Sequence, residues 1–123
     1  MFDFEKLTTY SKAKELNLQI KKDILSIDNL DKNNNDQLRR SSLSIVLNIA
    51  ESTSRFSDAD KRNFYVIARG SLIESIAILD LLKDELIINK ELYLELYFKG
   101  EELSKILYVL IKGLEKKINS VLL

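Results

Sequence analysis

The side chains of this chain that could do chemistry are carboxylates, serines and arginines, because histidine and cysteine are both absent. Without histidine, neither a Ser-His-Asp triad nor an imidazole base is available at neutral pH. Without histidine and cysteine, structural zinc, iron–sulfur clusters and haem lose their usual ligands, and thiol chemistry is excluded. Three types of site remain open: a carboxylate-only metal site, a bare acid/base pair, and an arginine patch that binds phosphate.

The carboxylates and serines do not form a recognisable catalytic pattern. Glu51 and Asp80 fall on predicted helices, but ferritin-like metal sites also require histidine. Ser41, Ser42 and Ser44 have no base partner, so we expect small residues at close helix contacts or weak hydrogen bonds to the backbone. The three glycines stand alone, and no Gly-rich phosphate loop is present. We therefore predict a protein that is not an enzyme and that has no cofactor and no metal.

The arginines are the most unevenly distributed charged residues. The total is neutral, with 19 Lys and Arg against 19 Asp and Glu, which argues against a strongly basic nucleic-acid-binding protein and leaves only a local patch. A guanidinium group binds phosphate or carboxylate through a planar fork of donors. One hypothesis is a phosphate-binding patch; the alternative is ion pairing with acids of a neighbouring helix or subunit. All five arginines lie within one 31-residue span, at Arg39, Arg40, Arg55, Arg62 and Arg69.

Four amphipathic segments must position these groups. The chain has no proline and only three glycines, which favours long helices. Apolar residues recur every three or four positions from about residue 7 to 27, 37 to 51, 58 to 88 and 90 to 118. The connections between these segments are short, which is typical of an antiparallel up-down four-helix bundle. We predict an all-α fold and a single domain over residues 1–123.

The helix boundaries are predicted from residues that cap helices. Asn35 or Asp36, at the end of a turn-favouring Asn/Asp run, is expected to cap the second helix. This would place the first two arginines in its first turn, where the positive end of the helix macrodipole favours a visiting anion. Ser57 and Asn89 are expected to cap the third and fourth helices. Leu86 is expected on the core face of the third helix.

Two residues are unusual inside the predicted helices. Asn48 is a mediocre helix former that is costly to bury unpaired, so we expect it to hydrogen-bond another helix or a partner, or to point outward. A buried polar contact that fixes helix register is the preferred interpretation. Gly70 costs about 0.5–1 kcal/mol against alanine, and close approach of a neighbouring helix is the expected compensation. Glu51 stands four residues before Arg55, an ordinary spacing for an ion pair on a helix.

The third and fourth predicted helices are more apolar than one core requires. In a four-helix bundle every helix keeps a solvent side, so an apolar stripe wider than about 100° indicates an oligomer. The alternative is a wide stripe that packs against two neighbouring helices of the same chain. The additional apolar residues are Ile67, Ile73, Ile78, Leu81, Tyr93, Tyr97, Ile106, Tyr108 and Ile111.

No segment of the sequence suggests a membrane or an export signal. The N-terminus carries acids where a secretory signal has basic residues, and no apolar region follows it. The longest purely apolar run, from Ile106 to Ile111, is far shorter than the roughly 18–20 residues that span a bilayer. The absence of cysteine gives no indication of an oxidising compartment. We expect a cytoplasmic protein with no membrane partner.

The stretch from Asp36 to Ser52, DQLRRSSLSIVLNIAES, resembles the central motif of a known family. That motif is approximately Gln-x-Arg-Arg-(Ala/Ser)-x-x-Ser-Ile-x-x-Asn-Ile-Ala-Glu-Gly, and further matches occur at Ala68-Arg69-Gly70-Ser71 and Glu74. The chain is similar to four-helix-bundle proteins encoded in intervening sequences of bacterial 23S rRNA genes. A related branch is the accessory variability determinant protein of diversity-generating retroelements. The central matches are Gln37, Arg39, Arg40, Ser41, Ser44, Ile45, Asn48, Ile49, Ala50 and Glu51.

This resemblance implies a bundle that assembles as a homopentameric ring or barrel. For the accessory branch it also implies a basic surface that binds RNA or DNA, and a reverse transcriptase as partner. Ser52 stands where the family often has glycine, and the connection between the first two helices lacks proline. Two hypotheses follow: an oligomer that binds nucleic acid through the five arginines, or a protein-interaction module whose arginines make subunit ion pairs. The motif residues expected to be structural are Gln37, Ser44, Asn48, Glu51 and Gly70.

Overall fold

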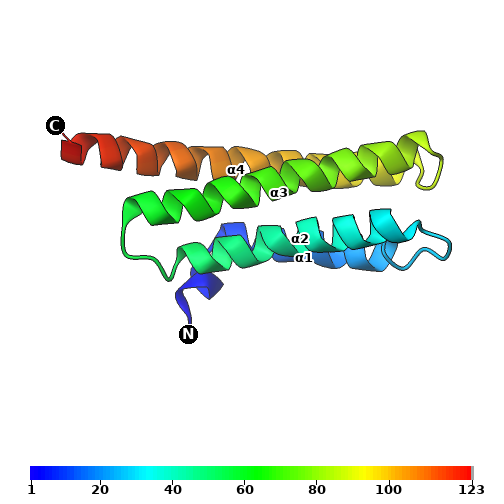
Figure 1. Ribbon diagram of the computed structural model, residues 1–123, viewed down its shortest axis with the longest axis horizontal. Helices are drawn as coiled ribbons and strands as arrows, with labels where there is room; N and C mark the ends of the chain where they lie inside the picture. Colours follow the sequence, from blue (N-terminus) through cyan, green and yellow to red (C-terminus); the bar gives the residue numbers. More distant parts are fainter. Residues whose placement is uncertain (123) are drawn as a thin grey trace.

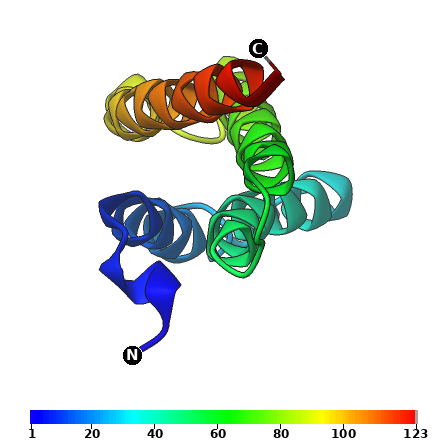
Figure 2. The ribbon, with the colours of Figure 1, turned by 90° about the vertical axis from the view of Figure 1, so that its left-hand side faces the viewer.

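The computed structural model describes residues 1–122, with side chains described as far as Ser120, and consists of helices (Figure 1). A short 3₁₀ turn, η1 (Asp3–Lys6), precedes α1 (Thr8–Asp23), α2 (Lys32–Ser52), α3 (Asp58–Asp84) and α4 (Lys90–Leu122). Each helix contacts its two neighbours in the order α1–α2–α3–α4–α1. Figure 2, which looks along the helices, shows α4 lying above α1 and α3 above α2. The predicted all-α, up-down four-helix architecture is confirmed.

The predicted caps of the last two helices are confirmed. The hydroxyl oxygen of Ser57 accepts a hydrogen bond from the backbone N–H of Asp60 at 3.1 Å, at the start of α3. The side-chain oxygen of Asn89 accepts one from the N–H of Leu92 at 2.7 Å, at the start of α4. Each cap satisfies one of the backbone donors that a helix leaves without a partner in its first turn.

The predicted start of α2 is wrong by about one turn. Asp31, not Asn35 or Asp36, is the cap, and its carboxylate accepts a hydrogen bond from the N–H of Asn34 at 3.2 Å. The Asn/Asp run is therefore the beginning of the helix, because its modest propensity penalty is tolerated once a cap and tertiary packing are in place. The first two arginines consequently lie beyond the first turn, outside the reach of the helix N-terminal dipole.

The first and third helices end earlier than their apolar periodicity predicts. α1 ends at Asp23 and α3 at Asp84, so both lose the last turn that the sequence suggested. Leu86, predicted to face the core, has a positive φ of 63° and is 90% exposed in the α3–α4 turn. Ile88 is buried instead, which returns an apolar side chain to the core just before α4 begins.

One apolar core runs along the bundle and is built from the predicted stripes of all four helices. At about 25 cal/mol per Å² of buried apolar surface, these side chains supply most of the stabilisation. If one helix lost its apolar face, the core side chains of the other three helices would be exposed to water along that side. The largest fully buried side chains are Leu16, Ile20, Ile24, Leu38, Ile45, Ile49, Leu72, Leu79, Leu82, Leu96, Leu103 and Leu107.

Hydroxyl groups join α2 to α3. The Ser41 and Ser75 hydroxyls are hydrogen-bonded at 2.8 Å, and so are those of Ser44 and Ser71. Asn48 donates to both the carbonyl and the hydroxyl oxygen of Ser44, at 2.8 and 2.9 Å. Small side chains allow α2 and α3 to approach closely, and their mutual hydrogen bonds offset the cost of burying them. The predicted role of the serines is confirmed. Asn48 does not bond another helix as predicted: its amide bonds Ser44 one turn earlier in α2, and reaches the seam only through that hydroxyl.

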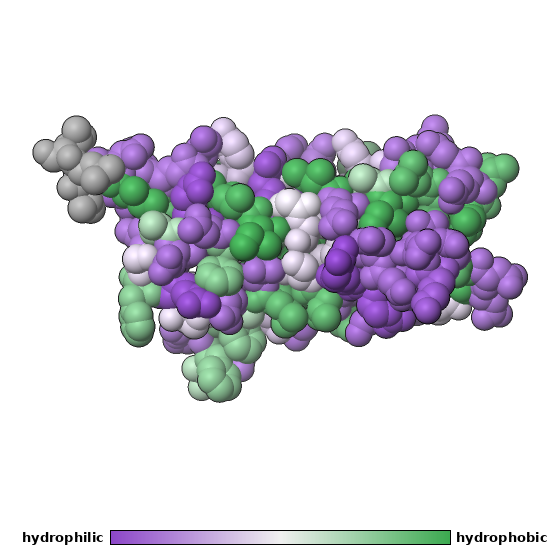
Figure 3. Space-filling model, viewed as in Figure 1, coloured by the Kyte–Doolittle hydropathy of each residue, from purple (hydrophilic) through white to green (hydrophobic). Residues whose placement is uncertain are grey.

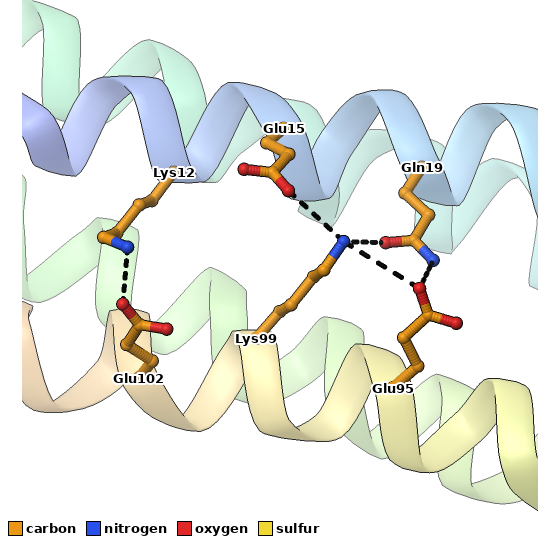
Figure 4. Close-up of polar contacts among 6 residues, drawn as sticks. All are labelled: Lys12, Glu15, Gln19, Glu95, Lys99 and Glu102. Carbon is orange, nitrogen blue, oxygen red and sulfur yellow. Dashed lines mark hydrogen bonds and ion pairs between the residues drawn. The ribbon is translucent and has the colours of Figure 1, made fainter.

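Long polar side chains bridge α1 and α4 (Figure 4). Lys99 Nζ lies 2.6 Å from the amide oxygen of Gln19 and 3.3 Å from a carboxylate oxygen of Glu15. Lys12 Nζ lies 2.5 Å from Glu102, and this hydrogen bond raises the pKa of Lys12 above its usual value. The groups of this seam are partly exposed, so salt should weaken it.

Substitution of Lys99 by methionine tests this seam. The change keeps the aliphatic stem but leaves the nearby carboxylates of Glu15 and Glu95 without their shared cation. We expect the free energy of unfolding to fall by about 1 kcal/mol at low salt, with a smaller difference in 1 M salt. Denaturant titration at one protein concentration measures it. Lys6→Met, which removes only the exposed pair with Asp3, is the control; equal effects of the two substitutions would contradict a special role for the seam.

Candidate functional site

The titratable side chains of residues 1–122 show where metal binding or acid–base chemistry could occur. Among residues 1–122, no group of three or more carboxylates is arranged to hold a metal ion. The same residues contain no helix that is both long and apolar enough to cross a bilayer. A hydrogen bond from Lys83 to Asp80 raises the pKa of Lys83, and burial raises the pKa of Tyr93. Both shifts favour the protonated form that each group already has at neutral pH, so neither becomes a base.

Two of the predicted arginines connect α3 to α4. Arg62 forms an ion pair with Glu115 at 3.3 Å, and Arg69 donates to the carbonyl of Ser104 at 3.4 Å. The Arg69 guanidinium also lies 5.6 Å from the centre of the Tyr108 ring, a cation–π distance. Arg62 and Arg69 stand seven residues apart and share one face of the helix. That face packs against α4.

Arg55 is held at the other end of the central motif. Its guanidinium lies 2.9 Å from Glu51, which confirms the predicted ion pair, and 4.5 Å from the centre of the Phe64 ring. The Nε atom is buried and has no hydrogen-bond partner among the described residues. Arg55 thus connects the end of α2 to the beginning of α3, across the short loop between them.

The five arginines do not lie together in one patch. The pairs Ser41–Ser75 and Ser44–Ser71 set the register of α2 against α3, and place Arg39 and Arg40 level with about residue 76 of α3. At 1.5 Å per residue, that level is about 20 Å along the bundle from Arg62. A single ligand contact by all five guanidinium groups would require an extended ligand.

Arg39 and Arg40 point in different directions. Successive helix residues project about 100° apart, so Arg39 lies on the side of Val46, seven residues later, and Arg40 lies above Leu43 and Leu47. Val46 is buried and lies away from the serines that contact α3, which places Arg39 on the α1 side. Within the part of the chain with described side chains, neither arginine has an ion-pair partner; Arg40 donates to the side chain of Gln37 at 2.5 Å.

Two lysines of α1 belong to the same side of the bundle as Arg39. Lys12 and Gln19 of α1 face α4, so Lys14 and Lys21 project from the opposite side, toward α2. We call Lys14, Lys21 and Arg39 the cationic face. No described carboxylate lies within ion-pair distance of these three groups, and Lys14 lies over the Tyr10 ring. Figure 3 shows strongly hydrophilic surface over the N-terminal half of α2.

A groove runs along the outer side of α3 and α4. Its wider part, of about 540 Å³, continues through Arg69 and Ile73 into a second hollow of about 320 Å³. No residue of α1 or α2 lines either part, so the groove faces away from those helices. We call this surface the α3–α4 groove. Its main apolar lining consists of Val66, Ile73, Ile76, Ala77, Tyr97 and Tyr108.

The exposure of the additional apolar side chains supports each of the two interpretations of the wide stripes, an oligomer or packing within the chain, at different residues. Ile73 is 53% exposed and Tyr108 49%, and Ile67 and Leu81 are also exposed. Ile111, by contrast, is buried in the core. Part of the additional apolar surface therefore packs within the chain, as the alternative proposed. The remainder, along the α3–α4 groove and beside it, has no partner among the described residues.

The close approach of helices occurs at Gly100, not at Gly70 as predicted. A Cβ added at Gly100 would lie 2.7 Å from the Cδ1 atom of Ile76, because α3 and α4 touch there. A Cβ at Gly70 would meet nothing within 4 Å, and Gly70 is exposed in the groove. No local sequence signal distinguishes the two glycines, because the register of α3 against α4 determines which of them lies at the close contact.

Comparison with known proteins agrees with this architecture. The family model described as "23S rRNA-intervening sequence protein" matches residues 5–109. A solved structure from Bacteroides thetaiotaomicron, described as a protein of unknown function from the S23 ribosomal protein family, is 28% identical to this chain. The two superpose with a TM-score of 0.80, over 85% of this chain and 99% of the other. No curated protein matches the sequence. The family match covers most of the chain, which therefore belongs to the 23S rRNA-intervening sequence protein family.

Proposed function

We propose that this protein is a non-catalytic, self-assembling protein whose copies meet through the α3–α4 groove. The observation that carries the proposal is the apolar lining of that groove, where Ile73 and Tyr108 are about half exposed. Contiguous exposed apolar surface of this kind marks interaction sites on soluble proteins. A ring of five subunits is the form of assembly that the resemblance of the central motif implies.

The intrachain contacts of the arginines support assembly over a ligand site at those residues. Arg62, Arg69 and Arg55 already hold elements of one chain together. If one of these guanidinium groups turned toward a ligand, its contact within the chain would be lost. Those contacts hold α3 against α4 or against the end of α2. Their positions fit a rigid subunit that presents preformed surfaces to its neighbours.

Light scattering of two matched variants tests this proposal. Ile73→Glu puts a charge in the groove, and we expect the particle mass to fall to that of one 14.2 kDa chain. Leu18→Glu makes the same type of change at an exposed leucine of α1, away from the groove, and should keep the wild-type mass. Retention of the assembled mass by the Ile73→Glu variant would contradict the proposal.

Binding of RNA or DNA is a second candidate function, and the cationic face supports it. Lys14, Lys21 and Arg39 pair with no carboxylate of the described residues, whereas Lys12, which faces α4, is paired with Glu102. Cations without carboxylate partners are available to neutralise phosphates, which supply most of the affinity of non-specific nucleic-acid binding. Of the five arginines predicted to bind nucleic acid, this candidate keeps Arg39 and adds Lys14 and Lys21 on the α1–α2 side of the bundle.

A further inference from the structure

We infer that the occupant of the α3–α4 groove is α2 of a second copy of this chain, which inserts a ridge formed by Arg40, Leu43 and Leu47. The inference rests on the proposed self-assembly and specifies the two surfaces that meet. They are different surfaces, so the contact is heterologous: each subunit uses its ridge toward one neighbour and its groove toward the other.

The ridge is an exposed apolar strip on a helix that is otherwise polar outside the core. Leu43 is 42% exposed and Leu47 55%, and their spacing of four residues places them one above the other. Arg40 precedes Leu43 by three residues and lies on the same strip. Among the described residues, Arg40 has no carboxylate within ion-pair distance. The strip combines two apolar contacts with one charge that is free for an intermolecular pair.

The groove has the shape that receives a helix ridge. Side chains of one helix pack into the groove between neighbouring side chains of another, and a small residue in that groove lets the helices approach more closely. Gly70 lies at the groove with open space above it, between Val66 and Ile73 on the same side of α3. Among the described residues, no close helix contact offsets the destabilising effect of glycine at this position, and room for a partner helix would explain it.

Charge and length also agree between the two surfaces. The wider part of the groove is lined by the carboxylates of Asp80 and Glu101 together with the cations of Arg69 and Lys105. Each carboxylate already contacts a lysine of its own chain, Lys83 for Asp80 and Lys105 for Glu101, and would share itself with Arg40 of the partner. Arg40 lies seven residues from Leu47, or about 10 Å along α2 at 1.5 Å per residue. Gly70 and Asp80 are about 15 Å apart along α3 by the same measure. With Leu47 beside Gly70, Arg40 comes near these carboxylates, and the inserted α2 runs antiparallel to the α3 that receives it.

The ridge is on α2, whereas the groove is on α3 and α4 and faces away from α2. A heterologous contact that repeats between two such surfaces closes into a ring when its rotation adds up to a full turn, and otherwise extends as a helical filament.

Two charge variants of the ridge, with a control at the residue beside it, provide the first part of the test. Leu47→Glu and Arg40→Gln are both expected to raise the dissociation constant of the wild-type assembly, by at least about 100-fold for the buried glutamate. Arg39→Gln removes the same charge one residue away, on the α1 side, and should leave assembly unchanged. Particle mass by sedimentation, with helix content by circular dichroism, gives the readout. Wild-type assembly by the Leu47→Glu variant would overturn the inference.

Mixing of two broken subunits distinguishes a heterologous contact from a symmetric one. The Leu47→Glu variant keeps an intact groove, and the Ile73→Glu variant keeps an intact ridge. Together they should form a two-subunit species, although each alone stays a monomer, because one good contact remains and the ring cannot close. A mixture that stays monomeric would overturn the pairing of ridge and groove. A wild-type chain that is itself monomeric would instead refute the proposed self-assembly.

Discussion

Replacement of Gly100 by leucine is expected to lower the free energy of unfolding by about 2–3 kcal/mol. The Cβ alone would lie 2.7 and 3.1 Å from two atoms of Ile76, and the leucine methyls would extend further into the contact between α3 and α4. Leu72 lies at 3.5 Å, an ordinary van der Waals contact, so Ile76 is the side chain that has to shift. The improved helix propensity of leucine over glycine, about 0.8 kcal/mol, offsets only part of this loss.

The same substitution elsewhere in α4 provides the control for the Gly100 prediction. A Cβ at Gly113 meets nothing within 4 Å, and Gly113 is exposed, so Gly113→Leu should leave stability unchanged or raise it by up to about 1 kcal/mol. Urea denaturation of both variants at one protein concentration measures the difference. Equal stabilities of the two variants would show that α3 and α4 do not approach closely at Gly100.

Removal of the cationic face is expected to weaken binding to single-stranded RNA by about 100-fold near 0.1 M salt. The triple variant Lys14→Gln, Lys21→Gln and Arg39→Gln deletes three cations that pair with no carboxylate of the described residues. Each phosphate contact contributes about 0.7 to the slope of log affinity against log salt concentration for a single strand. The slope should therefore fall by about 2 in the triple variant.

A second triple variant separates the cationic face from the effect of overall charge. Lys90→Gln, Lys116→Gln and Lys117→Gln remove the same total charge from exposed positions of α4. We expect little change in RNA affinity beyond the general charge effect, because these residues lie outside the α1–α2 side. Equal losses of affinity and of salt slope in the two triple variants would contradict a specific role for the cationic face.

Local signals allowed much of the fold to be predicted from the sequence. Helical periodicity identified the four helices and most of the core, because each stripe depends only on residues three or four positions apart. The caps Ser57 and Asn89 are equally local, since each needs only a backbone N–H three residues later. The sequence predicted that the serines of α2 lie at close helix contacts. Their partners Ser71 and Ser75 could be identified only from the structure.

The candidate sites were harder to predict because they depend on how helices pack. Arg39 and Arg40 are adjacent in the sequence, yet helical geometry directs them to different sides of α2. Lys14 and Lys21 are unremarkable in the sequence and join Arg39 only because α1 lies beside α2. Gly70 and Gly100 could be distinguished only by the register of α3 against α4, which places Ile76 over Gly100.

We expect the exposed apolar surface of the α3–α4 groove to be buried in an assembly of several copies. Sedimentation equilibrium of the unmodified chain from about 1 to 100 µM measures the mass directly. We predict a single species whose mass is a multiple of 14.2 kDa, with five copies expected for a closed ring. A mass of one chain at every concentration would contradict both the self-assembly and the ridge-in-groove contact.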